Sequence, residues 1–245
     1  MLIMGLGYNS QSWHRTLPAL TKHFQVIMFD NRGVGKSSMP EQPYSIEIMA
    51  NDARAVLDAA SVESAHVYGI SMGGMIAQRL ALAYPERVRS LVLGCTTAGG
   101  TTHIQPSPEI SELMVARADL TGTPEENAWA AAPIVYSQAF IHAHPELIQE
   151  DIEKRIEIVT PPHCYLSQLQ ACLAHDTSNE LGEINIPTLV IHGDSDELVP
   201  YRNGVNLAEN IQGAELFTVP GAGHIFFTEA TDLVNNKVIQ FLRNK

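Results

Sequence analysis

Short runs of apolar residues alternate along the chain with longer segments of helical periodicity. The runs lie at 1–5, 24–30, 64–70, 88–94, 187–193 and 214–221, and each is almost continuously apolar. Strands that are apolar on both faces are typical of a parallel sheet covered by helices on two sides. We therefore expect right-handed β-α-β units and an α/β fold with a doubly wound, mostly parallel sheet.

The segments between the runs carry helix signals. In the segment 44–60, apolar residues recur at spacings of three and four, and Ser45 stands where an N-cap is expected. The segment 72–84 is apolar nearly all round, as in a helix buried at the centre of a domain. The segment 228–245 has the pattern of an amphipathic closing helix.

The stretch 99–180 breaks the alternation because it contains no convincing strand. It carries helix starts instead, at Ser107-Pro108, at the capping box from Thr123 to Glu126, and at Pro145. We interpret 99–180 as a helical cap inserted between the fourth and fifth strands. The core then consists of two parts, 1–98 and 181–245.

Composition narrows the classes of function. The chain has 245 residues and a formal net charge of −12, and it has no run of Lys and Arg. Nucleic acids and anionic membrane surfaces attract basic proteins, so neither partner is expected. No signal peptide and no apolar run of transmembrane length is present, and three cysteines without a C-x-x-C pair fit reduced thiols. A cytoplasmic location is the expectation.

One pentapeptide carries candidate chemistry, Gly69-Ile70-Ser71-Met72-Gly73. It follows a predicted strand and opens a predicted helix, which is the context of a nucleophile elbow. Glycines at both ends remove side chains where the strand and the helix approach each other closely. Such pentapeptides also occur by chance, and a serine hydroxyl needs a base and an orienting acid to become a nucleophile.

Partners for the serine follow two later strands. His224 lies just after the last apolar run, and Asp194 and Asp196 follow the run at 187–193. The carboxyl ends of parallel strands meet at one edge of the sheet, so these side chains are expected to lie near Ser71. Either aspartate could serve as the acid, Asp194 being equally typical of a turn.

Five motifs together resemble the α/β-hydrolase fold family, in particular its small serine esterases, enol-lactonases and cofactor-free haloperoxidases. They are "MGLGYNSQSW", "DNRGVGKS", "GISMGG", "HGDSDELVP" and "GAGH", in the order that the family shows. The chain departs from the pattern at Met4, where a histidine is common. Two phosphate-binding patterns are excluded, because Asp30 replaces the first P-loop glycine and Ser10 replaces the last glycine of G-x-G-x-x-G.

The resemblance implies a catalytic triad of Ser71, His224 and Asp196. It also implies an oxyanion hole made by the backbone N–H groups of Leu6 and Met72. The implied function is hydrolysis of a small carboxylic ester or lactone through an acyl-enzyme on Ser71, with no metal or organic cofactor. Alternatives are a C–C bond hydrolase, a perhydrolase or haloperoxidase, and a ligand-capturing receptor with little turnover.

The resemblance also raises two expectations outside the triad. Some cap aromatics are expected to roof the pocket; the candidates are Trp129, Tyr136, Phe140 and Tyr165, and simple packing within the cap is expected for at least two of them. Relatives carry two strands before the oxyanion strand on which this chain begins, so the run at 24–30 would form an exposed sheet edge. A second copy of the chain could cover that edge, which makes a homo-oligomer an expectation.

His142 and His144, spaced as H-x-H, are expected to be solvated cap residues rather than metal ligands.

Overall fold

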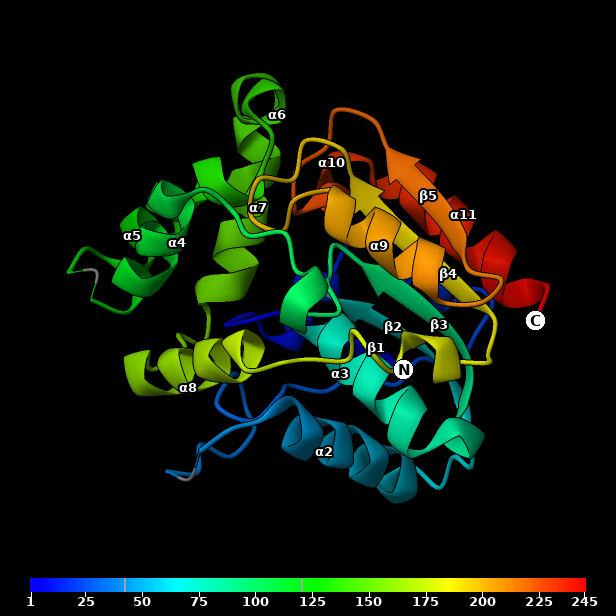
Figure 1. Ribbon diagram of the computed structural model, residues 1–245. Helices are drawn as coiled ribbons and strands as arrows, with labels where there is room; N and C mark the ends of the chain where they lie inside the picture. The colour runs from blue at the N-terminus through cyan, green and yellow to red at the C-terminus, as the bar shows by residue number, and fades with distance from the viewer. Residues whose placement is uncertain (42, 120) are drawn as a thin grey trace.

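The computed structural model describes residues 1–41, 43–119 and 121–245 and is built around a parallel sheet (Figure 1). The strands follow one another in space in the order β1-β2-β3-β4-β5. Their bounds are Leu2–Ile3 for β1, Ala65–Ile70 for β2, Val88–Gly94 for β3, Thr188–Gly193 for β4 and Glu215–Val219 for β5. All four pairings are parallel, as the continuous apolar runs predict.

Helices cover both faces of the sheet, so the α/β fold class is confirmed. On one face lie α2 (Ile46–Ala59), α3 (Met72–Ala83) and α9 (Arg202–Asn210), and on the other lie α1 (Leu17–Leu20), α10 (Phe226–Glu229) and α11 (Thr231–Arg243). Successive residues of β3 enter opposite cores: Leu91 packs with α2 and α3, and Val92 with α10 and α11. This alternation is why the strands are apolar throughout.

Local sequence signals fix several helix ends. The Ser45 hydroxyl accepts a hydrogen bond from the Ile48 N–H at 3.2 Å, so the predicted N-cap of α2 is confirmed. Short 3₁₀ turns complete the connections: η1 (Ser10–Trp13), η2 (Pro85–Arg87), η3 (Gly100–Thr102), η4 (Arg117–Asp119) and η5 (Leu181–Glu183). Among the described residues, no helix combines the length and the apolar character needed to cross a membrane.

The predicted strand at 24–30 is wrong. Only one bridge forms there, between Leu2 and Met28, with the Leu2 N–H donating to the Ile27 carbonyl at 2.8 Å. A ladder cannot be longer than its shorter partner, and β1 has only two residues because the chain turns away after Ile3. The segment nevertheless occupies the sheet edge where the sequence places it, with Met28 40% exposed.

In the described part of the chain between β3 and β4, the cap contains five α-helices. They are α4 (Pro108–Ala116), α5 (Pro124–Val135), α6 (Gln138–Ala143), α7 (Pro145–Ile156) and α8 (Pro162–Leu173). The capping box at α5 is present in both directions, between Thr123 and Glu126. The described part of 99–180 contains no strand beyond a single bridge between Gly99 and Asp176. The exact division of the chain at 98 and 181 stays a prediction.

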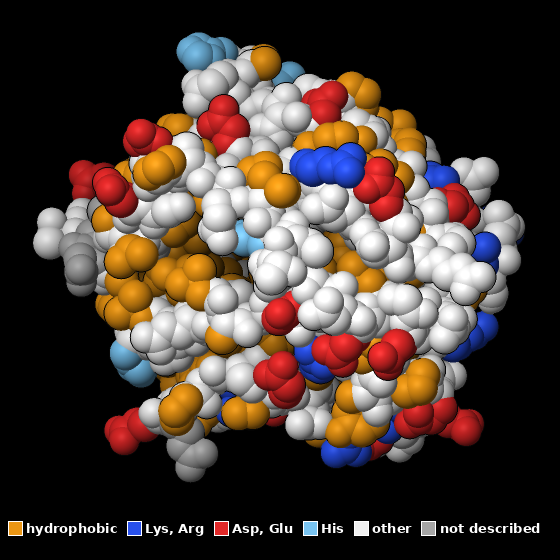
Figure 2. Space-filling model, in the orientation of Figure 1, with side chains coloured by type: hydrophobic (Ala, Val, Ile, Leu, Met, Phe, Trp, Pro, Cys, Tyr) orange, Lys and Arg blue, Asp and Glu red, His pale blue; other side chains and the backbone are white. Residues whose placement is uncertain are grey.

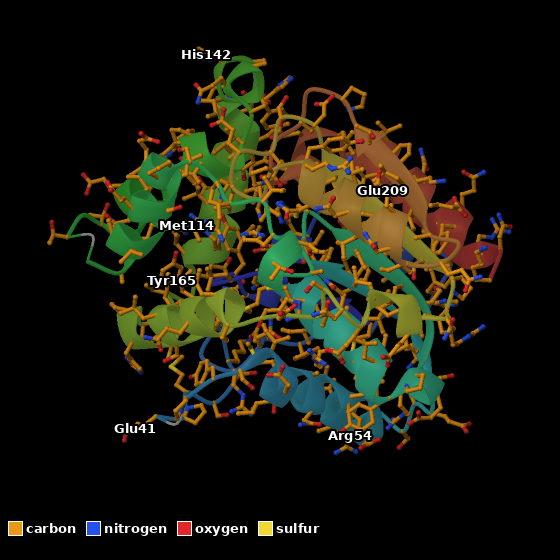
Figure 3. The ribbon with its side chains drawn as sticks, viewed as in Figure 1. Glu41, Arg54, Met114, His142, Tyr165 and Glu209 are labelled. Carbon is orange, nitrogen blue, oxygen red and sulfur yellow. The ribbon has the colours of Figure 1, made fainter. Side chains whose placement is uncertain are left out.

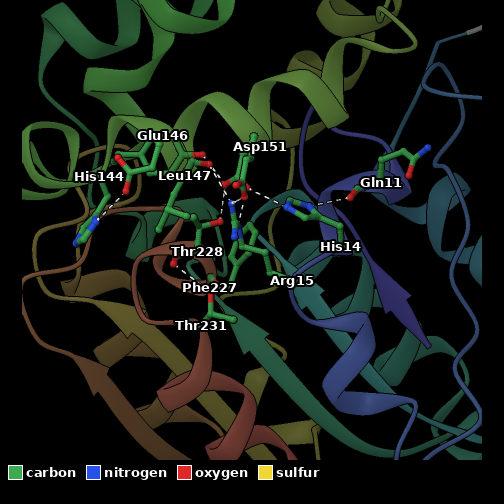
Figure 4. Close-up of polar contacts among 12 residues, drawn as sticks. Gln11, His14, Arg15, His144, Glu146, Leu147, Asp151, Phe227, Thr228 and Thr231 are labelled. Atoms are coloured by element: carbon green, nitrogen blue, oxygen red, sulfur yellow. Dashed lines mark hydrogen bonds and ion pairs between the residues drawn. The ribbon is translucent and has the colours of Figure 1, made fainter.

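One carboxylate fixes the cap to the core (Figure 4). Asp151 of α7 accepts hydrogen bonds from Arg15 Nε at 2.8 Å, Tyr136 Oη at 2.9 Å and Thr228 Oγ1 at 2.6 Å, and His14 Nε2 lies 3.2 Å away. Arg15 belongs to the segment after β1, and Thr228 belongs to α10. Asp151 therefore joins the cap to the segment after β1 and to α10.

Candidate active site

Ser71 stands on a strained turn between β2 and α3. Its backbone has φ 55° and ψ −118°, a conformation that costs a non-glycine residue about 1–3 kcal/mol. The two predicted glycine approaches are present. A Cβ on Gly69 would collide with the backbone of Gly73, and one on Gly73 would collide with the Ile3 carbonyl. The strained geometry needed to present a serine beyond the end of β2 therefore depends on these glycines.

His224 and Asp196 form a buried pair. His224 Nδ1 lies 2.7 Å from Asp196 Oδ2, and each residue is 5% exposed. The two loops that carry them leave the carboxyl ends of β5 and β4, as the sequence predicts. Asp194, the rival acid, lies on the surface instead, where its Oδ1 accepts the Gly221 N–H at 2.6 Å.

The Asp196 carboxylate is ionised and fixed in place. Its Oδ1 accepts the N–H groups of Leu198 at 3.0 Å and Val199 at 2.9 Å. Burial alone would raise its pKa, but the charge of His224 and the contacts with His224 and His192 hold the pKa at about 2. His192 Nε2 lies 3.2 Å from Asp196 Oδ2 and 2.8 Å from the Val199 carbonyl.

Ser71 and His224 face one cavity of about 540 Å³. Most of its lining is apolar and includes Met4, Ile70, Met75, Leu169, Leu198 and Phe227. On the surface, Figure 2 shows a hollow lined by hydrophobic side chains between α4 and α8. Ser71 and His224 are not hydrogen-bonded to each other. Such contacts often form only once substrate is bound, so the shared cavity is the informative observation.

The two predicted oxyanion donors belong to segments that meet at the serine. Leu6 lines the cavity and its N–H donates to no protein group within the described residues. Met72 is the first residue of α3, a position whose N–H has no partner within the helix. Gly5 lets the two segments meet, because a Cβ on it would lie 3.2 Å from Ser71 Cβ.

Residues of the "DNRGVGKS" loop hold the Leu6 segment in place. Asn31 Nδ2 donates to the Met4 carbonyl at 2.9 Å, and Asp30 Oδ1 accepts the Ser10 N–H at 2.7 Å. From the cap, Gln168 Oε1 accepts the Gly7 N–H at 2.8 Å. The motif makes Asp30 and Asn31 recognisable in the sequence. The groups that they bind belong to the backbone, so no sequence pattern predicts these contacts.

The expectation for the cap aromatics is wrong. Among the described residues, none of Trp129, Tyr136, Phe140 and Tyr165 lines the cavity. Tyr136 and Phe140 stack on each other with ring centroids 5.9 Å apart, and the Trp129 indole donates to Gln149. Cap residues of smaller section face the cavity instead, among them Met114, Val135 and Leu169. A large aromatic ring buries more apolar area when it packs among the cap helices than when it faces the cavity.

One group of side chains in the described residues offers three metal ligands close together. Atoms of Cys95, Asp196 and His224 all lie within 4.8 Å of one another and are buried. Burial raises the pKa of the Cys95 thiol well above its usual value, and the hydrogen bond from His224 occupies one oxygen of Asp196. His142, labelled in Figure 3, and His144 are both exposed on the cap, as the sequence predicts.

Comparison with known proteins agrees with this geometry. A family model described as the alpha/beta hydrolase fold matches residues 1–231. An Azorhizobium caulinodans protein, named provisionally as the carbamate hydrolase RutD, is 32% identical over 98% of this chain and 89% of its own length. A poly(3-hydroxyalkanoate) depolymerase from Ectopseudomonas oleovorans is 31% identical over 100% of this chain and 84% of its own length.

Solved structures show the same similarity. The enol-lactonase from Burkholderia xenovorans superimposes with a TM-score of 0.86 at 29% identity, over 99% of this chain and 90% of that one. A hydrolase from Pseudomonas aeruginosa superimposes with a TM-score of 0.86 at 31% identity, over 98% and 88% of the two chains. From the family match and the elbow, the chain belongs to the α/β-hydrolase fold family.

Proposed function

We propose that the protein is a serine hydrolase that cleaves a small carboxylic ester or lactone. The observation that carries the proposal is the buried His224–Asp196 pair, which shares one cavity with a serine held in a strained turn. Strain of this kind persists where the surrounding structure enforces it, and it is concentrated at functional sites. A plain turn serine would need neither the strain nor the adjacent pair.

The arrangement supports acyl transfer through a covalent intermediate. Ser71 Oγ attacks the carbonyl carbon while His224 Nε2 takes the hydroxyl proton, and Asp196 stabilises the imidazolium through Nδ1. The Leu6 and Met72 N–H groups stabilise the oxyanion, each such donor being worth about 10²–10³ in rate. His224 returns the proton to the leaving alcohol, and water activated by the same histidine then releases the acid.

The choice of substrate class rests on the cavity and on the relatives. A cavity of about 540 Å³ with a mostly apolar lining suits a small ester rather than a peptide or a sugar chain. Relatives are named for ester, lactone and carbamate hydrolysis. All three reactions need a nucleophile, a base and an oxyanion hole, so the catalytic groups do not distinguish them. The choice of an ester or lactone as the substrate is therefore what the experiment must test.

Replacing Ser71 by alanine is the direct test. Turnover of p-nitrophenyl acetate by S71A should fall by about 10⁴–10⁶-fold, as in the triads of other enzymes. S167A is the matched control, because Ser167 is a half-buried serine of α8, outside the cavity lining, whose hydroxyl donates to the His163 carbonyl. Unchanged turnover in S71A would refute the mechanism. A single product equivalent per protein, with tight retention of ligand, would indicate the ligand-capturing receptor instead.

A further inference from the structure

A second pocket lies in the cap beside the catalytic cavity. Its volume is about 280 Å³, and its wall includes Gly7, Arg117, Arg155 and Tyr165. Arg117 lines both hollows, and Gly7 lies between Leu6 and Tyr8, which line the catalytic cavity. The two spaces are therefore neighbours, and the Leu6–Tyr8 segment and Arg117 contribute to the walls of both.

Both arginines of this pocket lie over aromatic rings. Arg117 Cζ is 5.4 Å from the ring centroid of Tyr165, and Arg155 Cζ is 4.5 Å from that of Tyr8. The Tyr165 hydroxyl donates to the Met114 carbonyl at 2.9 Å, which fixes that ring between α4 and α8 (Figure 3). Stacking on a ring holds a guanidinium in one plane and leaves its N–H edges free for an anion.

Among the side chains that the structure describes, which leave out positions 42, 119 and 120, neither arginine has an acidic partner. Other arginines form ion pairs with a carboxylate, as Arg15 does with Asp151 and Arg32 with Asp52. The described wall of the second pocket contains no Asp or Glu, although the chain has a net charge of −12. Two half-buried positive charges on one pocket repel each other, and an anion between them would relieve that cost.

The contact between Tyr165 and Gly7 sets this charge close to the reacting centre. A Cβ on Gly7 would lie 3.0 Å from Tyr165 Cδ2, so the ring touches the residue after Leu6. Arg117 is also the single Lys or Arg in the described lining of the catalytic cavity. A substrate whose carbonyl lies between Leu6 and Ser71 can therefore extend toward Arg117 along this wall.

We propose that Arg117 and Arg155 bind a carboxylate group carried by the substrate. The preferred substrates are then esters or lactones with a second, ionised acid group at the far end of the acyl chain. This specificity rests on the proposed ester hydrolysis, but the anion-binding pocket itself does not. Bidentate arginine–carboxylate contacts supply both the charge and the orientation.

The test compares esters that differ only in charge. Monomethyl adipate is paired with methyl 6-oxoheptanoate, in which a neutral ketone replaces the carboxylate at equal chain length. The wild type should favour the acid ester in kcat/KM, and R117Q or R155Q should reduce that preference about tenfold or more, mainly through KM. R117K should keep part of it, because lysine retains the charge without the planar fork. Added salt should weaken the preference in the wild type.

The matched control is R54Q. Arg54 also lies over a tyrosine, with Cζ 5.3 Å from the Tyr84 ring centroid, but it is on α2, away from Tyr165 (Figure 3). R54Q should keep the wild-type preference. Equal losses for both esters in R117Q and R155Q, or no preference in the wild type, would overturn the carboxylate pocket.

Binding to the S71A variant separates this proposal from the proposed function. Titration calorimetry should show that monomethyl adipate binds S71A at least about tenfold more tightly than it binds S71A carrying R117Q or R155Q. If that holds while the wild type cleaves neither ester, ester hydrolysis fails and the anion pocket stands. If both esters are cleaved and binding does not change in the arginine variants, the pocket fails alone.

Sodium acetate should inhibit cleavage of the acid ester competitively. Acetate binding without competition would overturn the assignment to the substrate's own carboxylate.

Discussion

At the scale of single residues, the two aspartates after β4 differ in what surrounds them. Asp196 is buried and accepts two backbone N–H groups. Burial would raise its pKa, but the charge of His224 and the contacts with His224 and His192 hold the pKa at about 2. Asp194, two residues earlier, is exposed and supports the turn at Gly221. Only one of them can orient the His224 ring.

The pair therefore offers a matched test of the acid. D196N keeps the size of the side chain but removes the charge that stabilises the His224 imidazolium and selects its tautomer. We expect kcat on p-nitrophenyl acetate to fall by about 10⁴-fold, as for the same change in other triads. D194N should stay within a few-fold of the wild type. The reverse order of effects would reassign the acid to Asp194.

The positions of the candidate residues were predictable where a side chain carries the proposed chemistry. Ser71, Asp196 and His224 each stand in a short motif after a strand, and the structure brings all three to one end of the sheet. His192 of β4 is fully buried, but its 3.2 Å approach to Asp196 depends on how the loop after β4 folds back. Spacing along the sequence does not report that contact.

At the scale of elements, Asp151 is one of the side chains that attach the cap to the core. This carboxylate of α7 meets Arg15 from the segment after β1 and Thr228 from α10 (Figure 4). Burial would raise its pKa, but hydrogen bonds from His14, Thr228 and Arg15 hold the pKa below the usual value. The carboxylate is therefore ionised, and its loss would leave the Arg15 charge with only the exposed Glu150 as a partner.

D151N should consequently destabilise the fold. Breaking a buried pair from one side costs about 3–5 kcal/mol, and the remaining Glu150 contact places the expected loss at the lower end of that range. Urea unfolding measures the change. E209Q serves as the control, since Glu209 pairs with Arg202 on the surface, where such a pair is worth under about 1 kcal/mol. Equal midpoints for the two variants would contradict the anchoring role.

Elements were predictable from periodicity with one exception. Five apolar runs became strands, and capping signals at Ser45 and Thr123 marked true helix starts. The run at 24–30 has the same composition but lacks a long neighbour, since β1 stops at Ile3. Whether a run becomes a strand depends on its partner in space, and local sequence does not contain that partner.

At the scale of the whole molecule, the edge at 24–30 bears on assembly. Met28 is 40% exposed beside β1, and the segment forms a single bridge to the sheet. Exposed edges offer unpaired backbone groups to another chain. We propose that a second copy covers this edge. Sedimentation should then give a concentration-dependent mass above the monomer value of 26.8 kDa, and M28K should shift it toward the monomer. A monomer at all concentrations would refute the proposal.

The stability of the whole fold should depend on pH through His175. This residue is 3% exposed; burial first, and then the charge of Arg79, lower its pKa from 6.5 to about 4, against the opposing charges of Glu47 and Asp176. Between pH 4 and 6.5 the unfolded chain therefore binds a proton that the folded chain refuses, so stability falls as pH falls through this window. The shift corresponds to about 2 kcal/mol lost between pH 7.5 and pH 5.

A glutamine at position 175 cannot titrate, so H175Q should show a flatter fall in unfolding free energy over that range, whatever its stability at pH 7.5. Urea denaturation at pH 7.5, 6 and 5 measures the slope, which separates titration from lost packing. H142Q should keep the wild-type slope because His142 is exposed on the cap. Parallel slopes for the wild type and H175Q would show that the acid sensitivity comes from other groups, such as His66 and His103, whose pKa values burial also lowers.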